Sequence, residues 1–229
     1  MKVTLIRITP EAINAIETAA SNCYDSEPTD GKIANSCYNS GHLSVLEFAD
    51  IHFKVEGISR ACANQILRHR TGKFEQRSQR YCKESGFEYV TPPSIQDNVQ
   101  ANKLYEEFIH KTQDYYDYLI DMDVPKEDAR YVLPNACDTV LDVKFDLRNF
   151  IHFCNDRLCA RAQWEIRGVA KEMVRLVVEQ EPKCKPWLVP KCEIYTGYPF
   201  CIETKSCGRH PKLKDVYRAY EENKEKEVN

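Results

Sequence analysis

The chain has 229 residues, of which 42% are hydrophobic and 29% charged, and its formal net charge is -3. This composition is typical of a soluble globular protein with a sizeable core, built as one large domain or two small ones. The pI of 6.1 excludes the overall basic character of a nucleic-acid-binding protein. No apolar run is long enough to span a membrane, and residues 1–6 do not resemble an export signal, so we expect a cytoplasmic protein.

The first half of the chain predicts strands and helices without strict alternation. β-branched residues favour a first strand, Pro10 is placed where a helix can begin, and alternating polarity favours a second strand with a slip near Ala49. Gly57 is expected to end that strand, and Ser59 to cap a helix that runs to about Arg68. The predicted elements are strands over 3–9 and 48–56 and helices over 11–20 and 59–68.

The second half predicts longer helices around one more strand. Aromatic residues recur along an amphipathic helix over 95–121, and alternation predicts a strand over 136–145. Asp146 is expected to cap a helix over 147–155, and a further helix over 162–179 has one apolar stripe. The expected fold is therefore α+β, or complex α/β, with a mixed sheet and long helices in a single domain over 1–218. Residues 219–229 are rich in Glu, Lys and Asn and predict a charged, flexible tail.

Residues 65–81 are the most informative stretch for function. Five cations face one opposing carboxylate, Glu75, and Gly72 interrupts the chain among them: Arg68, Arg70, Lys73, Arg77 and Arg80. A turn of this kind can present guanidinium groups, backbone N–H groups and a hydroxyl to one anion, and phosphate is the natural ligand. A solvated basic loop would explain the charge equally well, but not the His, Ser, Gln and Tyr residues set among the arginines.

Two further clusters are compatible with an anionic ligand. Arg148 and His152 share a helix face, with Arg157 beyond them, although taken alone an exposed face with ordinary ion pairs is the commoner outcome. His42 and Ser44, two positions apart, would point the same way in a strand, but a hydrogen-bonded structural histidine is commoner than a site.

The spacing of these residues resembles a known family. Arg68-His69-Arg70, then seven residues, then Ser78 is similar to the Arg-His-Arg-x7-Ser signature of flavin-dependent thymidylate synthases. Three more segments fit in the same order along residues 40–180: His42-x-Ser44-x-x-Glu47, Arg130-Tyr-Val-Leu-Pro134, and Arg157 ahead of Ala162-Gln163-Trp164-Glu165. The chain departs from the commonest pattern at Phe48, Glu75-Gln76, Asp146 and His152.

The resemblance implies an activity, cofactors and an assembly. Members of the family methylate dUMP to dTMP, with methylenetetrahydrofolate as carbon donor and FAD, reduced by NADPH, as hydride source. They are homotetramers with active sites at subunit interfaces, and neither nucleic acid nor a membrane is an expected partner. The resemblance implies that dUMP is bound by Gln65, Arg68, Gln76, Ser78, Gln79, Arg80, Arg130 and Arg157. It implies that FAD is bound by Ser44, Arg68, His69, Arg70, Gln76, Asp146, Arg148 and His152.

Two residues have implied catalytic roles. A cation at Arg157 near the uracil would favour loss of the N3 proton and make ring carbon 5 more nucleophilic. Ser78 is interpreted first as a residue that positions the ligand and second as a nucleophile, since the sequence offers no activating base for it. A nucleic-acid or nucleotide-binding module without catalysis and an inactive relative are the alternatives. The acidic pI disfavours the first, and the intact set of Arg68, Ser78, Arg80 and Arg157 disfavours the second.

Eleven cysteines are present, and without an export signal most are expected to be reduced, buried thiols. Cys62, Cys137, Cys154 and Cys159 lie in apolar segments and fit this expectation. Towards the end of the chain Cys184, Cys192, Cys201 and Cys207 lack any Cys-x-x-Cys pair, and His210 follows them. The zinc signal is therefore weak, and free thiols are preferred to a metal site.

Overall fold

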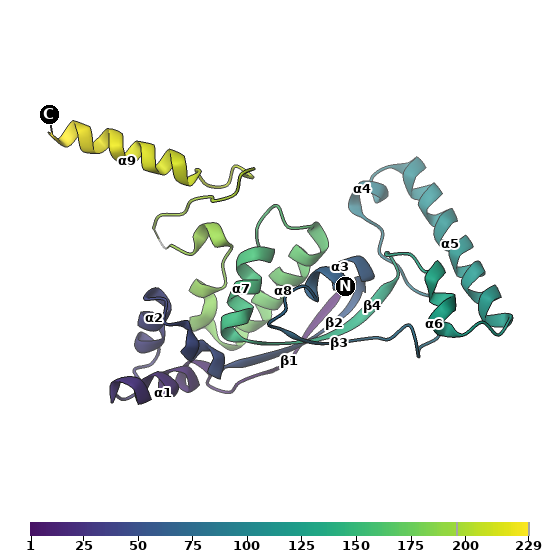
Figure 1. Ribbon diagram of the computed structural model, residues 1–229, viewed down its shortest axis with the longest axis horizontal. Coiled ribbons are helices and arrows are strands. Elements are labelled where there is room, and N and C mark those ends of the chain that lie inside the picture. The colour runs from purple at the N-terminus through teal and green to yellow at the C-terminus, as the bar shows by residue number, and fades with distance from the viewer. Residues whose placement is uncertain (196, 229) are drawn as a thin grey trace. The chain divides into compact units, whose positions relative to one another are not determined.

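The computed structural model describes residues 1–195 and 197–228, with the backbone alone for Tyr24 and for 223–228 (Figure 1). It divides into two compact units. The first comprises Met1–Thr4 and His52–Lys144, and the second comprises Leu5–Ile51 with the described residues from Phe145 onward. The strands form one sheet in the order β1-β2-β4-β3, with bounds β1 (Lys2–Ile8), β2 (Asp50–Ser59), β3 (Lys73–Gln76) and β4 (Asp138–Asp146).

The hydrogen bonds at the strand ends show that β1 and β2 are antiparallel. The Thr9 backbone N–H donates to the Asp50 carbonyl at 2.9 Å, so the end of β1 meets the start of β2. At the other end, a Cβ added to Gly57 would lie 3.4 Å from the Met1 nitrogen. The segment between the two strands therefore brings the chain back to the edge of the sheet where β1 ends. Strand β2 starts there and runs antiparallel to β1.

The remaining strand pairs are antiparallel as well. Leu147 N–H donates to the Ala49 carbonyl at 2.8 Å, and Arg60 N–H donates to the Cys137 carbonyl at 2.9 Å, at opposite ends of β2 and β4. Strand β3 pairs with β4 in antiparallel register, from Lys73 opposite Lys144 to Gln76 opposite Leu141. The sheet is therefore an open antiparallel one, and the expectation of a mixed sheet was wrong, whereas the α+β class is confirmed.

In the first unit, Ser59 caps α3 (Arg60–Ile66) as expected, with its hydroxyl accepting from Cys62 N–H at 3.0 Å. Gly57 lies inside β2 with a positive φ of 65° and does not end the strand. The helix expected over 95–121 is divided by Asn98, whose side chain accepts from Ala101 N–H and caps the longer part. The helices that follow are α4 (Pro93–Gln96), α5 (Val99–Asp121), α6 (Lys126–Ala129) and the 3-10 turn η2 (Arg130–Val132).

In the second unit, Asp146 caps α7 (Leu147–Arg157) as expected, with its carboxylate accepting from Asn149 N–H at 2.8 Å. The predicted apolar stripe of α8 (Trp164–Gln180) is confirmed, since Ile166, Val169, Ala170, Met173 and Val177 are fully buried. The other elements are α1 (Ala12–Tyr24), α2 (Lys32–Asn39), α9 (Leu213–Val228) and the 3-10 turns η1 (Leu43–Phe48), η3 (Pro182–Trp187) and η4 (Lys191–Glu193).

Several sequence expectations need correction in this unit. Helix α1 begins at Ala12 because Glu11 has a left-handed φ of 48°, so Pro10 lies outside the helix. Cys159 is half-buried, whereas Cys62, Cys137 and Cys154 are fully buried as expected. Residues 219–228 are the end of α9, and the flexibility predicted for them stays a prediction, with Asn229 outside the described residues. Among the described helices, none is long and apolar enough to cross a membrane.

Candidate active site

The basic stretch of the first unit contains a strand that its sequence did not reveal. Residues Lys73–Gln76 were expected to be part of a turn, but they form β3 because their backbone groups pair with β4. The Gln76 amide donates to the Thr139 hydroxyl at 3.4 Å, so its side chain is held beside β4. The segment that follows is thus held at the edge of the sheet.

Arg77 anchors the segment that leaves β3. Its backbone N–H donates to the Val140 carbonyl at 2.9 Å, and its Nε donates to the Glu84 carboxylate at 3.0 Å. The Glu84 side chain is only 7% exposed, and its backbone N–H donates to the Tyr116 hydroxyl. The hydrogen bond that Arg77 donates to the Glu84 carboxylate raises the pKa of Arg77. Arg77 therefore holds the two ends of the loop 77–84 together. Its guanidinium group is paired with Glu84 within the protein.

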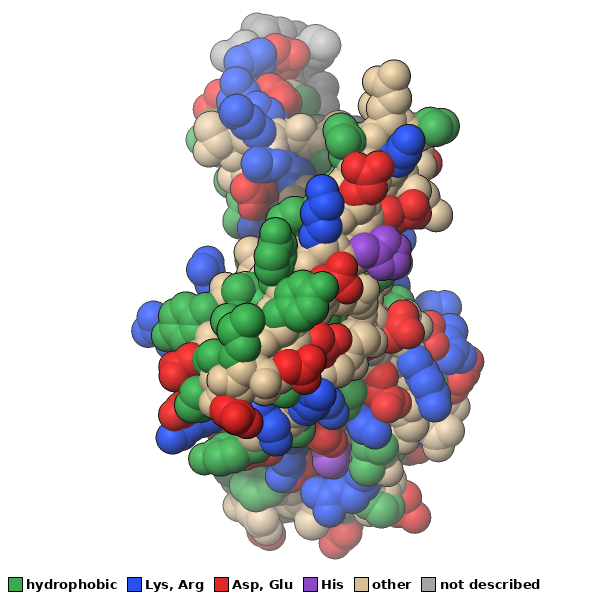
Figure 2. All heavy atoms as spheres, turned by 90° about the vertical axis from the view of Figure 1, so that its right-hand side faces the viewer, with side chains coloured by type: hydrophobic (Ala, Val, Ile, Leu, Met, Phe, Trp, Pro, Cys, Tyr) green, Lys and Arg blue, Asp and Glu red, His purple; other side chains and the backbone are tan. Residues whose placement is uncertain are grey.

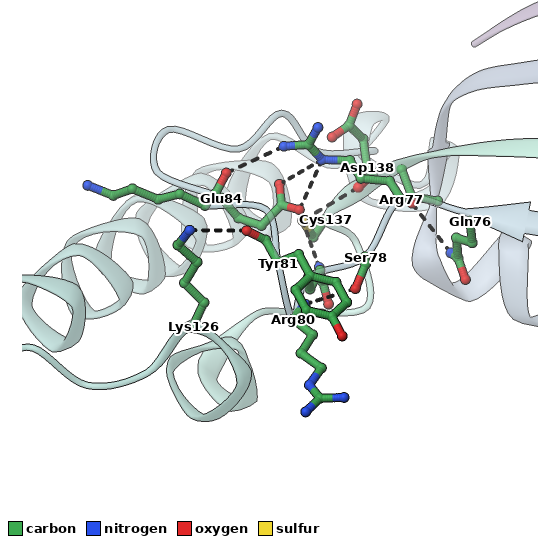
Figure 3. Close-up of polar contacts among 12 residues, drawn as sticks. Gln76, Arg77, Ser78, Arg80, Tyr81, Glu84, Lys126, Cys137 and Asp138 are labelled. Carbon is green, nitrogen blue, oxygen red and sulfur yellow. Dashed lines mark hydrogen bonds and ion pairs between the residues drawn. The ribbon is translucent and has the colours of Figure 1, made fainter.

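The turn that starts at Ser78 presents Arg80 outward (Figure 3). The Ser78 carbonyl accepts from Cys82 N–H at 2.9 Å, and its hydroxyl accepts from Arg80 N–H at 3.3 Å. The Arg80 side chain is 56% exposed, and its guanidinium group points away from the network and pairs with Glu127 at 2.6 Å. An exposed ion pair of this kind is weak, so the guanidinium can exchange Glu127 for another anion.

Gln79 points into the protein. Its side chain is buried, and its amide donates to the Cys137 sulfur at 3.6 Å. Burial raises the pKa of Cys137 to about 12, so this thiol is neutral at physiological pH. Cys137 is accordingly a packing residue and not a nucleophile. The Gln79 side chain packs into the same core and does not face solvent.

The Arg68-His69-Arg70 triplet forms a turn after α3. His69 N–H donates to the Ile66 carbonyl at 3.0 Å, and Gly72 N–H donates to the His69 carbonyl at 2.9 Å. His69 is buried, whereas both flanking arginines are exposed. The turn therefore directs two guanidinium groups outward around one buried imidazole.

The other residues of the first unit that are expected to bind the nucleotide are Gln65 and Arg130, and both are half-buried. Arg130 follows α6, and its Nε donates to the Glu127 carbonyl at 3.0 Å. Glu127 therefore contacts Arg80 through its carboxylate and Arg130 through its carbonyl, and it places the two arginines close together. Sequence reasoning missed Glu84 and Glu127, since single acidic residues at such distances carry no recognisable spacing.

The remaining expected site residues belong to the second unit. Ser44 is exposed on η1, and the nearby Glu47 pairs with exposed Arg148 of α7 at 2.6 Å. His152 is exposed one turn further along α7, 4.0 Å from Asp156, and Arg157 is half-buried at its end. The Asp146 carboxylate is occupied as a cap, since one oxygen accepts from the Asn149 backbone and the other from its side chain at 2.6 Å. The structure thus brings Ser44 and Arg148 to neighbouring surface positions through Glu47.

The expected residues are therefore distributed over both units. The first unit carries Gln65, Arg68, His69, Arg70, Gln76, Ser78, Gln79, Arg80 and Arg130. The second unit carries Ser44, Asp146, Arg148, His152 and Arg157. Both sets contain exposed guanidinium groups, those of Arg68, Arg70 and Arg80 in the first and that of Arg148 in the second, and guanidinium groups are donors suited to phosphate.

Comparison with known proteins assigns the family. The family model described as "Thymidylate synthase complementing protein" matches residues 4–183. A flavin-dependent thymidylate synthase of Geobacter sulfurreducens is 38% identical over 231 residues, which covers 95% of this chain and 98% of the relative. Relatives of the same name from Clostridium tetani and Pyrococcus furiosus are 32% and 35% identical, over 95% and 86% of this chain and 97% and 88% of their own lengths. The chain belongs to the flavin-dependent thymidylate synthase family.

Proposed function

We propose that the protein methylates dUMP to dTMP as a flavin-dependent thymidylate synthase. The observation that carries this proposal is the loop 77–84, in which Arg77 pairs with the buried Glu84, whereas Arg80, beside Ser78, forms an exposed pair with Glu127 that a ligand can replace. When bound, FAD reduced by NADPH supplies the hydride, and methylenetetrahydrofolate supplies the carbon. The residues of the chain bind and orient the reactants and stabilise the anionic form of the uracil ring.

The proposed dUMP site uses the arginines as phosphate and uracil ligands. Arg80 exchanges its exposed partner Glu127 for the nucleotide phosphate, and Arg68 and Arg130 add charge-assisted bonds. The amides of Gln65 and Gln76 hydrogen-bond the nucleoside, and Gln79 supports the loop from the core. Ser78 positions the ligand, since its hydroxyl already accepts from the Arg80 backbone.

Arg157 is proposed to act on the base. A fixed guanidinium beside uracil N3 stabilises the anion that forms when the N3 proton leaves. The negative charge then raises the nucleophilicity of carbon 5, where the new carbon is attached. Arg157 lies at the end of α7 and is half-buried, so part of its charge is screened from water.

The donor set also fits the diphosphate of FAD. Arg68, Arg70 and Arg148 are exposed and offer planar forks to anionic oxygens, and Ser44 and Gln76 add neutral donors. His69 and His152 provide ring contacts to the flavin. Asp146 contributes by capping α7 and so holding Arg148 and His152 in place, because its carboxylate is already satisfied by Asn149.

A homotetramer is the assembly that we propose. Helix α5 buries one face, with Ile109, Thr112 and Tyr116, and exposes a second apolar face. Figure 2 shows apolar side chains gathered on the side of the chain that carries α5. The exposed face comprises side chains that recur at helical spacing and are 54–73% exposed: Leu104, Phe108, Tyr115, Tyr118 and Met122. An apolar face of this kind is typical of a protein–protein interface, and a second copy of the chain is its proposed occupant.

Activity is tested with the purified full-length protein. We expect a yellow protein whose flavin absorbance bleaches with NADPH under anaerobic conditions, and dTMP formation when dUMP and methylenetetrahydrofolate are added. Arg157→Ala should reduce the rate by about a hundredfold or more, as loss of one charge-stabilising group does. Arg175→Ala is the matched control, because Arg175 pairs with Glu172 and Glu179 on the surface of α8 and is not among the proposed ligand-binding residues.

The outcomes separate the two candidate functions. A protein that binds neither FAD nor NADPH but still binds dUMP would be a nucleotide-binding relative without catalysis. Full activity of Arg157→Ala would reject the role of Arg157 in ionising the base.

The proposed assembly is tested by light scattering. The wild-type protein should have the mass of four chains, and Phe108→Asp should lower this mass.

A further inference from the structure

Five potential metal ligands of the second unit line one pocket. They are the thiols of Cys159, Cys192, Cys201 and Cys207 and the imidazole of His210. Cys159 follows α7, Cys192 lies in η4, and Cys201, Cys207 and His210 lie between η4 and α9. Cys159 comes two residues after Arg157, which is assigned to the nucleotide, but the proposed reaction uses none of the five.

Backbone hydrogen bonds bring these segments together. Phe200 N–H donates to the Cys192 carbonyl at 3.1 Å, and Cys201 N–H donates to the Pro211 carbonyl at 2.7 Å. The Cys201 carbonyl in turn accepts from Leu213 N–H at 3.1 Å. Three stretches that carry thiols or His210 are thus held side by side by the main chain, independently of any side-chain ligand.

The ligand atoms of Cys192 and His210 lie close to each other. Ligand atoms of Cys192, Glu193 and His210 all lie within 4.8 Å of one another. Ligands around a tetrahedral zinc ion are about 3.4–3.8 Å apart, given bonds of about 2.1–2.3 Å. Small side-chain rotations therefore suffice to close Cys192 and His210 on one ion.

Glu193 fits the role of an orienting partner. His210 Nε2 lies 3.0 Å from the Glu193 carboxylate, which leaves the other ring nitrogen for an ion. Histidine ligands of zinc usually donate their second N–H to a carboxylate in this way. Arg209 also contacts Glu193, at 2.5 Å, so the carboxylate is itself held in place.

The surroundings offset the charge that thiolates would bring. Arg161, Lys191 and Arg209 line the pocket with one lining carboxylate, Glu203. Glu203 pairs with both Arg161 and Lys191. A zinc ion with three thiolates and one neutral imidazole carries a single negative charge, and the surplus of cations is of the opposite sign.

The segment also lacks a core of its own. Of the described residues between 191 and 212, Cys201 alone is buried. Short segments that bury little apolar surface are commonly stabilised by a metal or a disulfide, and in this chain all eleven cysteines are free thiols.

We propose that this pocket is a structural zinc site, with Cys192 and His210 as two ligands and two of the thiols of Cys159, Cys201 and Cys207 as the others. This differs from the sequence expectation of free thiols without a metal. Tertiary structure adds Cys159 to the cluster and excludes Cys184, which is buried in η3 and does not line the pocket. The ion fastens the segment before α9 to the end of α7.

The test is the metal content of the untagged, full-length protein, measured by mass spectrometry of the elements. Wild type should contain about one zinc ion per chain. Cys192→Ser and His210→Ala should each lose most of it, and parallel Ser variants of the other three cysteines identify the remaining two ligands. Cys23→Ser is the matched control, since Cys23 is an exposed thiol outside the pocket and should leave zinc unchanged.

A second measurement does not depend on the folding of variants. Titrating wild type with a mercurial that blocks thiols should release zinc to a chromogenic chelator in step with the thiols modified. Wild type without zinc, iron in its place, or undiminished zinc in Cys192→Ser would each overturn the proposal. Flavin content is measured on the same samples, so loss of zinc is distinguished from failure of the proposed activity.

Discussion

Replacing Glu17 by glutamine is expected to destabilise the second unit strongly, although Glu17 is not among the residues proposed to bind the nucleotide, the flavin or zinc. Glu17 is fully buried in α1, and its carboxylate accepts hydrogen bonds from the chain that leads into α2. One oxygen accepts from Thr29 N–H at 2.6 Å. The other accepts from the N–H groups of Gly31, Ile33 and Ala34 at 2.8–3.2 Å and from the Thr29 hydroxyl.

The magnitude follows from these bonds. Glutamine keeps one oxygen for the three N–H groups at the start of α2, but it turns an NH2 group toward Thr29 N–H, where both groups are donors. Loss of one charge-assisted bond costs about 1.5–3 kcal/mol, and the remaining bonds become neutral and weaker, while burying an uncharged amide offsets part of the loss. We expect a net loss of about 2–4 kcal/mol, which lowers the unfolding temperature by roughly 5–15 °C for a chain of this size.

The effect must also depend on pH. Burial by itself raises the pKa of Glu17, but hydrogen bonds from Gly31, Thr29 and Ala34 outweigh it, so the pKa lies below the ordinary value of 4.5. A carboxyl with a lowered folded-state pKa stabilises the protein fully above its unfolded pKa. This stabilisation is lost as pH falls through the folded pKa, so the difference between wild type and Glu17→Gln should be constant near neutrality and shrink in acid.

Thermal unfolding of both proteins between neutral pH and the acid limit of folding is the assay. Glu27→Gln is the control, because Glu27 is an exposed glutamate in the same segment and should unfold like wild type. An unfolding temperature of Glu17→Gln within about 1 °C of wild type, or a difference that grows in acid, would refute the reasoning.

Substitutions at three further positions test the local structure around the proposed site, each by chemical or thermal unfolding. Arg77→Ala leaves the buried Glu84 carboxylate without its partner and should cost about 1–3 kcal/mol, the lower part of the range because Arg77 reaches solvent; an unchanged midpoint would contradict its anchoring role. Gly57→Ala forces a side chain into a φ of 65° and should cost about 1–2 kcal/mol, whereas a stabilised variant would show that β2 relaxes. Asp146→Ala should lose about 1 kcal/mol of capping energy and Asp146→Asn much less, and equal losses would exclude the cap.

Two helix caps and one apolar stripe could be predicted from the sequence, because neighbouring residues decide them. Ser59 and Asp146 cap helices as expected, because a cap is made by a side chain and an N–H group three residues away. The apolar stripe of α8 was equally visible, since it depends only on helical spacing. The family signature is likewise a matter of order and spacing along one chain.

Long-range pairing decided what the sequence left open. Strand β3 exists because β4 supplies its hydrogen-bond partners, and the antiparallel order follows from where α1, α2 and η1 return the chain. Arg77 and Arg80 cannot be told apart as cations in the sequence. In the fold, Arg77 pairs with the buried Glu84, whereas Arg80 makes a weak, exposed contact with Glu127 that another anion can replace.

The cysteines illustrate the same division. Their number and the absence of close pairs could be counted from the sequence, but spacing alone grouped Cys184 with the later thiols. Folding buries Cys184 and places Cys159 beside Cys192 and His210 instead. The sequence by itself determined which groups are available, the caps of α3 and α7 and the apolar stripe of α8, because those depend on neighbours along the chain. Only the tertiary structure decided which groups meet, because burial and charge pairing join residues far apart in sequence.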